Sequence, residues 1–208
     1  GSVIVKDFSA EKFKMHLKSN KVNVIKILPG GVVTAKDTAE IQLDENGEFV
    51  RNPEEDIVKV AVVERHQGTG NVACGFLKGY GIKAGAVALS IAHDSHNIIV
   101  VGVSDEEMEF AVNSLIAQEG GMVLVKEGKV LESMPMPIAG LMSDQSGEWV
   151  DEKLTAIHAK AYEELGIAGD VEPVMTLCFM SLAVIPEIKL TDMGLFDVTT
   201  FSFIPVEV

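Results

Sequence analysis

The sequence predicts an α+β fold, in which a mixed, largely antiparallel sheet, or two such sub-sheets, is layered with about three helices. Apolar runs rich in Val, Ile and Ala, such as Ile57–Val63, are typical of buried strands. Several strand candidates are joined by short turns and two segments show helical spacing, which favours α+β over a purely parallel sheet. The 208 residues contain no repeat or low-complexity linker, so we expect one compact unit over residues 1–208.

The first third of the chain predicts one short helix followed by strands. Ser9 can accept from the free amides of a first helical turn, and Phe8 can pack on Phe13, so a helix is expected from there to about Lys18. The expected strands cover residues 22–28, 39–43, 48–51 and 57–63. The second and third of these would form a hairpin, because Asn46-Gly47 between them favours positive φ angles.

The middle of the chain predicts two strands and a well-marked helix. Gly75, Gly79, Gly81 and Gly85 do not match a dinucleotide-binding motif, and we interpret them as glycines of a bent strand or turn. Residues 86–91 and 98–101 are apolar runs expected to be buried strands. Ser104 and Glu107 form a capping box that begins a helix, which ends at Gly120-Gly121.

The last part predicts a second hairpin, a second long helix and a closing strand. The hairpin pairs residues 122–125 with 129–131, and apolar positions at helical spacing predict a helix over residues 148–165. Prolines keep residues 134–142 out of helix and central strand, so this segment is expected to be a packed loop or part of an interface. Further along are an apolar segment that could be helix or strand, a stretch of polar turns and a closing strand, at residues 174–185, 189–197 and 201–206.

Composition excludes several classes of function. A net charge of −14 without a Lys/Arg cluster disfavours nucleic acid and anionic membranes as partners. The apolar runs are shorter than the ~20 residues of a membrane helix, and the N-terminus has no signal-peptide pattern. Cys74 and Cys178 are the only cysteines and lie far apart, so we expect a reduced, cytoplasmic protein. Gly1-Ser2 without an initiating Met suggests a fragment of a longer chain.

Two polar clusters stand out between apolar runs. One is the segment Ala92–Asn97, which contains His93, Asp94, Ser95 and His96. The second, Glu64-Arg65-His66 and the residues up to Asn71, follows the apolar run 57–63 and is expected to face the first.

The residue types of these clusters leave their chemistry open. His93 and His96 supply too few ligands for a metal site, and Asp94, Ser95 and His96 lack a nucleophile-elbow motif. A hydrogen-bonded turn and a functional site therefore remain roughly equal interpretations.

Several long motifs in the same order add a resemblance to a known family. Residues 62–71, 76–86, 92–102, 137–144 and 186–192 resemble the C-terminal portion of bacterial adenine deaminases. The resemblance implies an upstream amidohydrolase barrel, on the same polypeptide, that binds a divalent metal, manganese or iron, and converts adenine to hypoxanthine and ammonia. Nothing in this chain matches that barrel, so we expect no metal to be bound here and no deaminase activity from this chain alone.

The resemblance also gives the polar clusters a role. In one interpretation His93, Asp94, Ser95, His96 and Asn97, together with Glu64, Arg65 and His66, approach the mouth of the barrel and help to hold or close over adenine. In another the clusters stabilise the domain and its docking or dimer surface. A stand-alone ligand-binding module has no sequence feature in its favour. We also expect a homo-oligomer.

Overall fold

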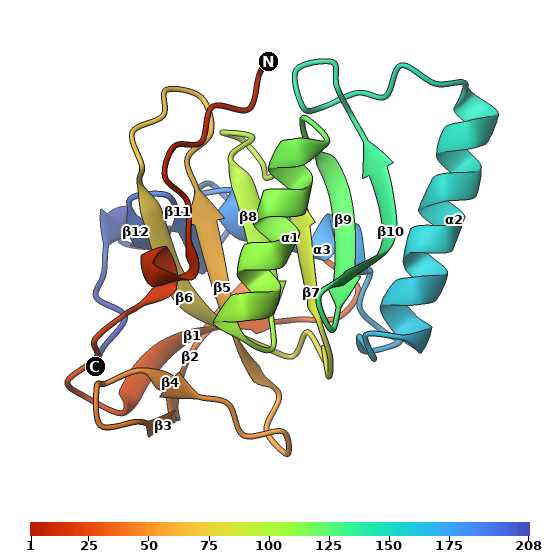
Figure 1. Cartoon of the computed structure of the whole chain (residues 1–208). Coiled ribbons are helices and arrows are strands. Elements are labelled where there is room, and N and C mark those ends of the chain that lie inside the picture. Colours follow the sequence, from red (N-terminus) through yellow and green to blue (C-terminus); the bar gives the residue numbers. More distant parts are fainter.

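An eight-stranded sheet forms the centre of the computed structural model, which describes residues 1–208 (Figure 1). The strands lie in the order β10 (Lys129–Pro135), β9 (Gly121–Lys126), β7 (Ala86–Leu89), β8 (Ile98–Gly102), β5 (Ile57–Val63), β6 (Val72–Lys78), β1 (Lys21–Ile27) and β2 (Thr34–Glu40). All neighbours are antiparallel except β1 and β6, which are parallel. The predicted α+β class is confirmed.

Helices cover both faces of this sheet. In Figure 1, α1 (Asp105–Ala117) crosses the near face, whereas α3 (Pro173–Cys178) and a small sheet lie behind it. The small sheet contains β11 (Ile188–Thr191), β12 (Gly194–Asp197) and β13 (Ser202–Phe203), and α2 (Gly147–Glu163) packs beside β10. A third, two-stranded sheet joins β3 (Gln42–Leu43) to β4 (Phe49–Val50). No helix combines the length and apolar character that crossing a membrane requires.

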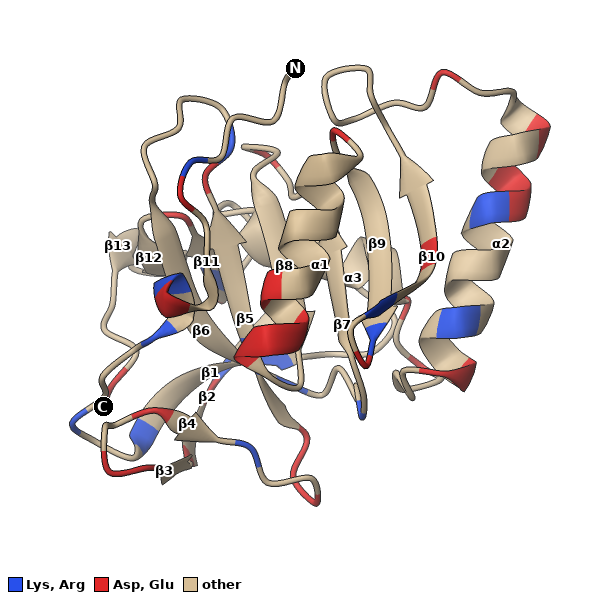
Figure 2. Ribbon diagram, in the orientation of Figure 1, with Lys and Arg blue, Asp and Glu red and all other residues tan.

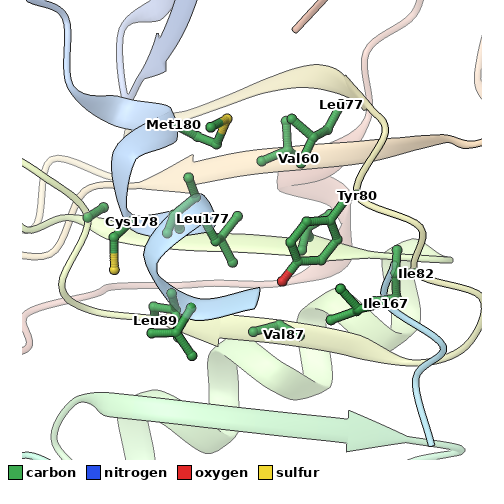
Figure 3. Packing of buried hydrophobic residues seen from close by; sticks show 14 of the residues in the cluster. Val60, Leu77, Tyr80, Ile82, Val87, Leu89, Ile167, Leu177, Cys178 and Met180 are labelled. Atoms are coloured by element: carbon green, nitrogen blue, oxygen red, sulfur yellow. The ribbon is translucent and has the colours of Figure 1, made fainter. Parts of the chain in front are cut away.

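The central strands are buried on both faces because their side chains alternate between two apolar clusters. Val60 and Val62 of β5 belong to the cluster behind the sheet, whereas Ala61 and Val63 belong to the cluster under α1. Figure 3 shows the first cluster, where Leu177 of α3 lies near Tyr80 and strand residues such as Val60. Strands β7 and β8 carry no charged residue, so the charges lie mostly on helices, loops and outer strands (Figure 2). The near-continuous apolar runs of the sequence follow from this double burial.

The elements with the strongest sequence signals are confirmed. Strand β5 has the predicted bounds, and α1 begins where Ser104 Oγ accepts a hydrogen bond from the backbone N of Glu107 at 3.2 Å. The second long helix, predicted from residue 148, begins one residue earlier at Gly147, where Ser146 Oγ accepts a hydrogen bond from Trp149 N. Burial and capping therefore agree with the local sequence pattern at these elements.

The helix expected from Ser9 to Lys18 is wrong. Only a 3₁₀ turn, η1 (Ala10–Phe13), forms, and Ser9 makes no side-chain cap. The backbone N–H groups of Met15 and His16 donate instead to the Glu48 carboxylate, at 3.0 and 2.9 Å. This distant acceptor replaces helical bonding, although the predicted Phe8–Phe13 contact does form, edge to face at 5.4 Å.

The sequence analysis missed most of β2 and all of β11 and β12. Strand β2 is an edge strand of mostly polar residues, of which only the last part was expected to be extended. Residues 189–197, predicted as polar turns, instead form the β11–β12 hairpin. That prediction failed because it assigns Lys189 to an exposed turn. The Lys189 side chain is instead fully buried, and its Nζ donates to Val32 O at 3.0 Å. The expected closing strand is reduced to β13, and the ambiguous segment 174–185 starts with α3 and a 3₁₀ turn, η2 (Phe179–Ser181).

Candidate functional site

The two polar clusters lie against each other where the neighbouring central strands β5 and β8 meet their loops. Loop 64–71 leaves β5 and loop 90–97 enters β8, and these antiparallel strands pair Val63 with Ile98. His66 Nε2 lies 2.7 Å from Ser95 O, to which it donates because a carbonyl can only accept. The structure thus brings the sequence-predicted residues together.

Glu64 is committed to holding its own loop. Its carboxylate accepts from the backbone N of His66 at 2.5 Å and of Gln67 at 2.8 Å, and from both N and Oγ1 of Thr69 at 2.9 and 3.0 Å. Burial opposes ionisation, but these hydrogen bonds outweigh it and lower the pKa of Glu64 to about 2. A saturated carboxylate of this kind is a loop anchor and leaves no oxygen for a proton transfer.

Arg65 joins four separate segments through its guanidinium. Its side chain is 1% exposed, and burial lowers its pKa. The acceptors are backbone carbonyls at 2.5 to 3.3 Å, those of His96, Ser2, Ser90 and Ala139. The Arg65 backbone N also donates to Asn97 Oδ1 at 3.3 Å, which gives buried Asn97 a structural role as well.

His93, Asp94, Ser95 and His96 form the open part of the site. The His93 ring stacks on Phe179 with centroids 5.0 Å apart and lies 5.5 Å from the His96 ring. The Asp94 side chain is 85% exposed. Ser95 Oγ accepts from Asn97 N at 3.4 Å, so the hydroxyl belongs to the turn rather than to a histidine, and no catalytic triad forms.

His96 is the histidine of the two loops that has a buried ring nitrogen without a hydrogen-bond partner. Its Nδ1 is buried without a partner, and its backbone has the left-handed φ of 56°. Burial, His93 and Arg65 lower the pKa of His96, so the ring is neutral near pH 7. A neutral imidazole has one nitrogen that donates and one that accepts, and neither nitrogen of His96 is hydrogen-bonded within the chain.

These residues do not fit a metal site. No group of three or more His, Cys, Asp or Glu side chains converges anywhere in the structure. The divalent metal that the resemblance implies therefore finds no set of ligands among these residues.

Three residues of the site could not be found from their sequence context. Phe179 lies in η2 and stacks on His93 because the backbone N of His93 bonds to Cys178 O at 2.8 Å. Ser90 is fully buried, and its Oγ donates to Gly140 O at 2.6 Å. Gly140 has φ of 72°, and a Cβ there would lie 2.8 Å from the Arg65 guanidinium. Only the prolines and glycine of loop 134–142 hinted at such packing.

Comparisons with known proteins agree with the resemblance seen in the sequence. The family model described as the adenine deaminase C-terminal domain matches residues 31–202. A protein named adenine deaminase 2 from Desulfotalea psychrophila is 67% identical over 207 residues, which is 100% of this chain and 36% of that protein. An adenine deaminase from Ligilactobacillus salivarius is 50% identical over 99% of the chain and 36% of its own length. The chain thus spans about a third of the length of these relatives.

Proposed function

Because the chain belongs to the adenine deaminase C-terminal domain family, we propose that it is one domain of a longer adenine deaminase and forms part of the wall of the active site. The proposed reaction converts adenine and water to hypoxanthine and ammonia. The metal, manganese or iron, would be bound by the amidohydrolase barrel that the resemblance places upstream. When bound, such a metal supplies the activated water. Residues 1–208 would then be one unit whose open loop faces that barrel.

The observation that carries this proposal is the free ring of His96. The other buried polar side chains of the two loops have hydrogen-bond partners within the chain, as the bonds of Glu64 and Arg65 show. A histidine that only stabilised a turn would have at least one ring nitrogen bonded, since an unpaired buried polar atom costs ~1–3 kcal/mol. Adenine offers both donors and acceptors around its ring edge, which suits a neutral imidazole.

The neighbours of His96 support the same role. His93 is held flat against Phe179, so one ring face is packed, while 42% of its side chain is exposed. Glu64, Arg65 and His66 would act indirectly, by fixing the backbone of residues 95–97. We therefore assign substrate contact to His93 and His96, and loop positioning to Glu64, Arg65, His66 and Asn97.

Alanine variants in the full-length protein test the proposal. His96→Ala is expected to lower kcat/KM for adenine about tenfold or more, because one lost hydrogen bond of ~1.4 kcal/mol corresponds to that factor. His93→Ala should lower it less, and both should leave the melting temperature and metal content nearly unchanged. His16→Ala, at an exposed histidine outside the site, is the matched control. Full activity of His96→Ala combined with a lowered melting temperature would refute the functional role.

The isolated chain gives a second test. We expect no ammonia release from adenine by the purified 208-residue chain, even with added manganese, since its residues form no metal site. Isothermal titration with adenine should show no binding to the chain alone. Heat of binding in that titration would instead favour a stand-alone ligand-binding module.

The environment of the full-length protein is also part of the proposal. Burial raises the pKa of Cys74 and Cys178 to about 12, so both thiols are unreactive, and neither is in a disulfide. This suits a reducing cytoplasm. We also propose a homo-oligomer, which light scattering of the full-length protein would test.

A further inference from the structure

An open depression of about 380 Å³ lies directly beside the polar loop of the candidate site. Asp94 and Ser95 line one side of it. The other sides come from the segment after η2, the turn between β11 and β12, and the strands β12 and β13. The depression and the candidate site therefore form one continuous surface.

Large apolar side chains project around this depression. Val184 is 69% exposed, Met193 72% and Phe203 52%. Removing side chains of this size from water is favourable. Exposed apolar side chains gathered in this way are typical of a surface that another protein surface covers.

The polar groups around the depression define the chemistry of that surface. Asp94 and Asp192 line it, whereas no Lys or Arg does. The Ser181 side chain, 6% exposed, also lines it, and its Oγ is buried without a hydrogen-bond partner. A fitting partner thus carries an apolar side chain, a flanking Lys or Arg and a hydrogen-bonding group.

Charge argues against a second copy of this chain as the occupant. A symmetric contact would bring the same patch from both copies together, so Asp94 and Asp192 would face the same acidic residues. The net charge of −14 adds to that repulsion. Most of the polypeptide of the relatives lies outside the matched region, since the chain covers 36% of the Desulfotalea protein.

We propose that the depression is the docking surface for the remaining part of the same polypeptide. An apolar side chain of that part enters the depression, while a flanking Lys or Arg pairs with Asp94 or Asp192. Docking there places Asp94 and Ser95 within the contact and His93 and His96 next to it, which fixes the loop against the rest of the protein. This inference rests on the proposed function, because it names the partner surface of the same site.

Photo-cross-linking in the full-length protein tests the docking. The photoreactive residue p-benzoylphenylalanine replaces Met193 in one variant and Val184 in a second, so that one failed variant does not end the test. The control carries it at Met175, which is also exposed but lies on α3 away from the depression. Digestion and mass spectrometry then identify the cross-linked peptides.

The expected result is an intramolecular cross-link from position 193 or 184 to a peptide outside residues 1–208, with Lys or Arg near the attached apolar residue. The control should give at most a tenth of that yield. A covalent dimer on a denaturing gel, which would mean a second copy, overturns the proposal, and so does the absence of cross-links from both positions. The readout needs no activity, so an active His96→Ala enzyme together with an intramolecular cross-link would reject the active-site role and keep the docking.

Discussion

The loop after β5 and the loop before β8 are both rich in polar residues, but they differ in how far their side chains are hydrogen-bonded. Both place polar residues beside apolar strands. In the first loop Glu64 and Arg65 are buried and saturated with hydrogen bonds, whereas in the second His93 and Asp94 are open and the His96 ring has no partner. Polar residues next to buried strands can therefore either hold the backbone of a loop in place or keep side-chain groups free for other contacts. The hydrogen bonds that they make within the chain distinguish these two cases.

The largest expected effect comes from removing the guanidinium at the centre of the scaffold. Arg65→Met should destabilise the chain by ~3–5 kcal/mol, because it leaves several buried carbonyls without donors. Urea unfolding of the wild-type and variant chains measures this. Arg51→Met is the matched control, since Arg51 is half-buried and its one hydrogen bond, to Ile82 O, measures 3.3 Å. A loss at Arg65 no larger than at Arg51 would remove the distinction between scaffold and open loop.

Glu64→Gln should have the next largest effect, ~1–3 kcal/mol, because an amide replaces a carboxylate that accepts four hydrogen bonds. The pKa of Glu64 is lowered from 4.5 to about 2, so its contribution to stability is present above pH 4.5 and is lost as the pH falls through 2. Denaturant unfolding between pH 2 and 7 should show the wild-type advantage over Glu64→Gln shrinking with acidity. Glu55→Gln, at an exposed position, should follow the wild-type curve.

The sequence predicted the centre of the fold better than its edges, for a physical reason. Strand β5 and helix α1 are specified by burial and capping that are local in sequence. Strand β2 is held by pairing with β1, and the buried Lys189 of β11 donates a hydrogen bond to the distant Val32 O. Such elements depend on distant partners, which a local pattern does not contain.

The same limit applies to the candidate site. Apolar flanks and turn chemistry were enough to predict that the two polar clusters meet. The sequence did not reveal which residues are saturated, because the acceptors for Arg65 come from Ser2, Ser90 and Ala139, which belong to separate segments. Phe179, which holds the His93 ring, is likewise brought in by tertiary packing alone.

His158, which lies outside both loops, sharpens the comparison because both of its ring nitrogens have partners, whereas the His96 ring has none. His158 on α2 has Nδ1 2.6 Å from Leu154 O and Nε2 in contact with the Glu172 carboxylate. Both partners are acceptors, so both ring nitrogens carry protons in this arrangement. Burial opposes that charge, but the two hydrogen bonds outweigh it and raise the pKa of His158 above 6.5.

The smallest expected effect follows from this bonded histidine. Because the folded-state pKa of His158 is raised, its contribution is fully present below pH 6.5 and is lost as the pH rises through the folded value. The pair is partly exposed, so the change should be at most ~1 kcal/mol. Unfolding of the wild type and His158→Gln from pH 5.5 to 9 should show the difference between them vanish at the alkaline end. NMR titration of the ring protons should place the midpoint of His158 above that of His96, whose pKa is lowered. The reverse order would mean that His96 has found a charge-stabilising partner in solution, and the contrast between a free and a bonded histidine would then fail.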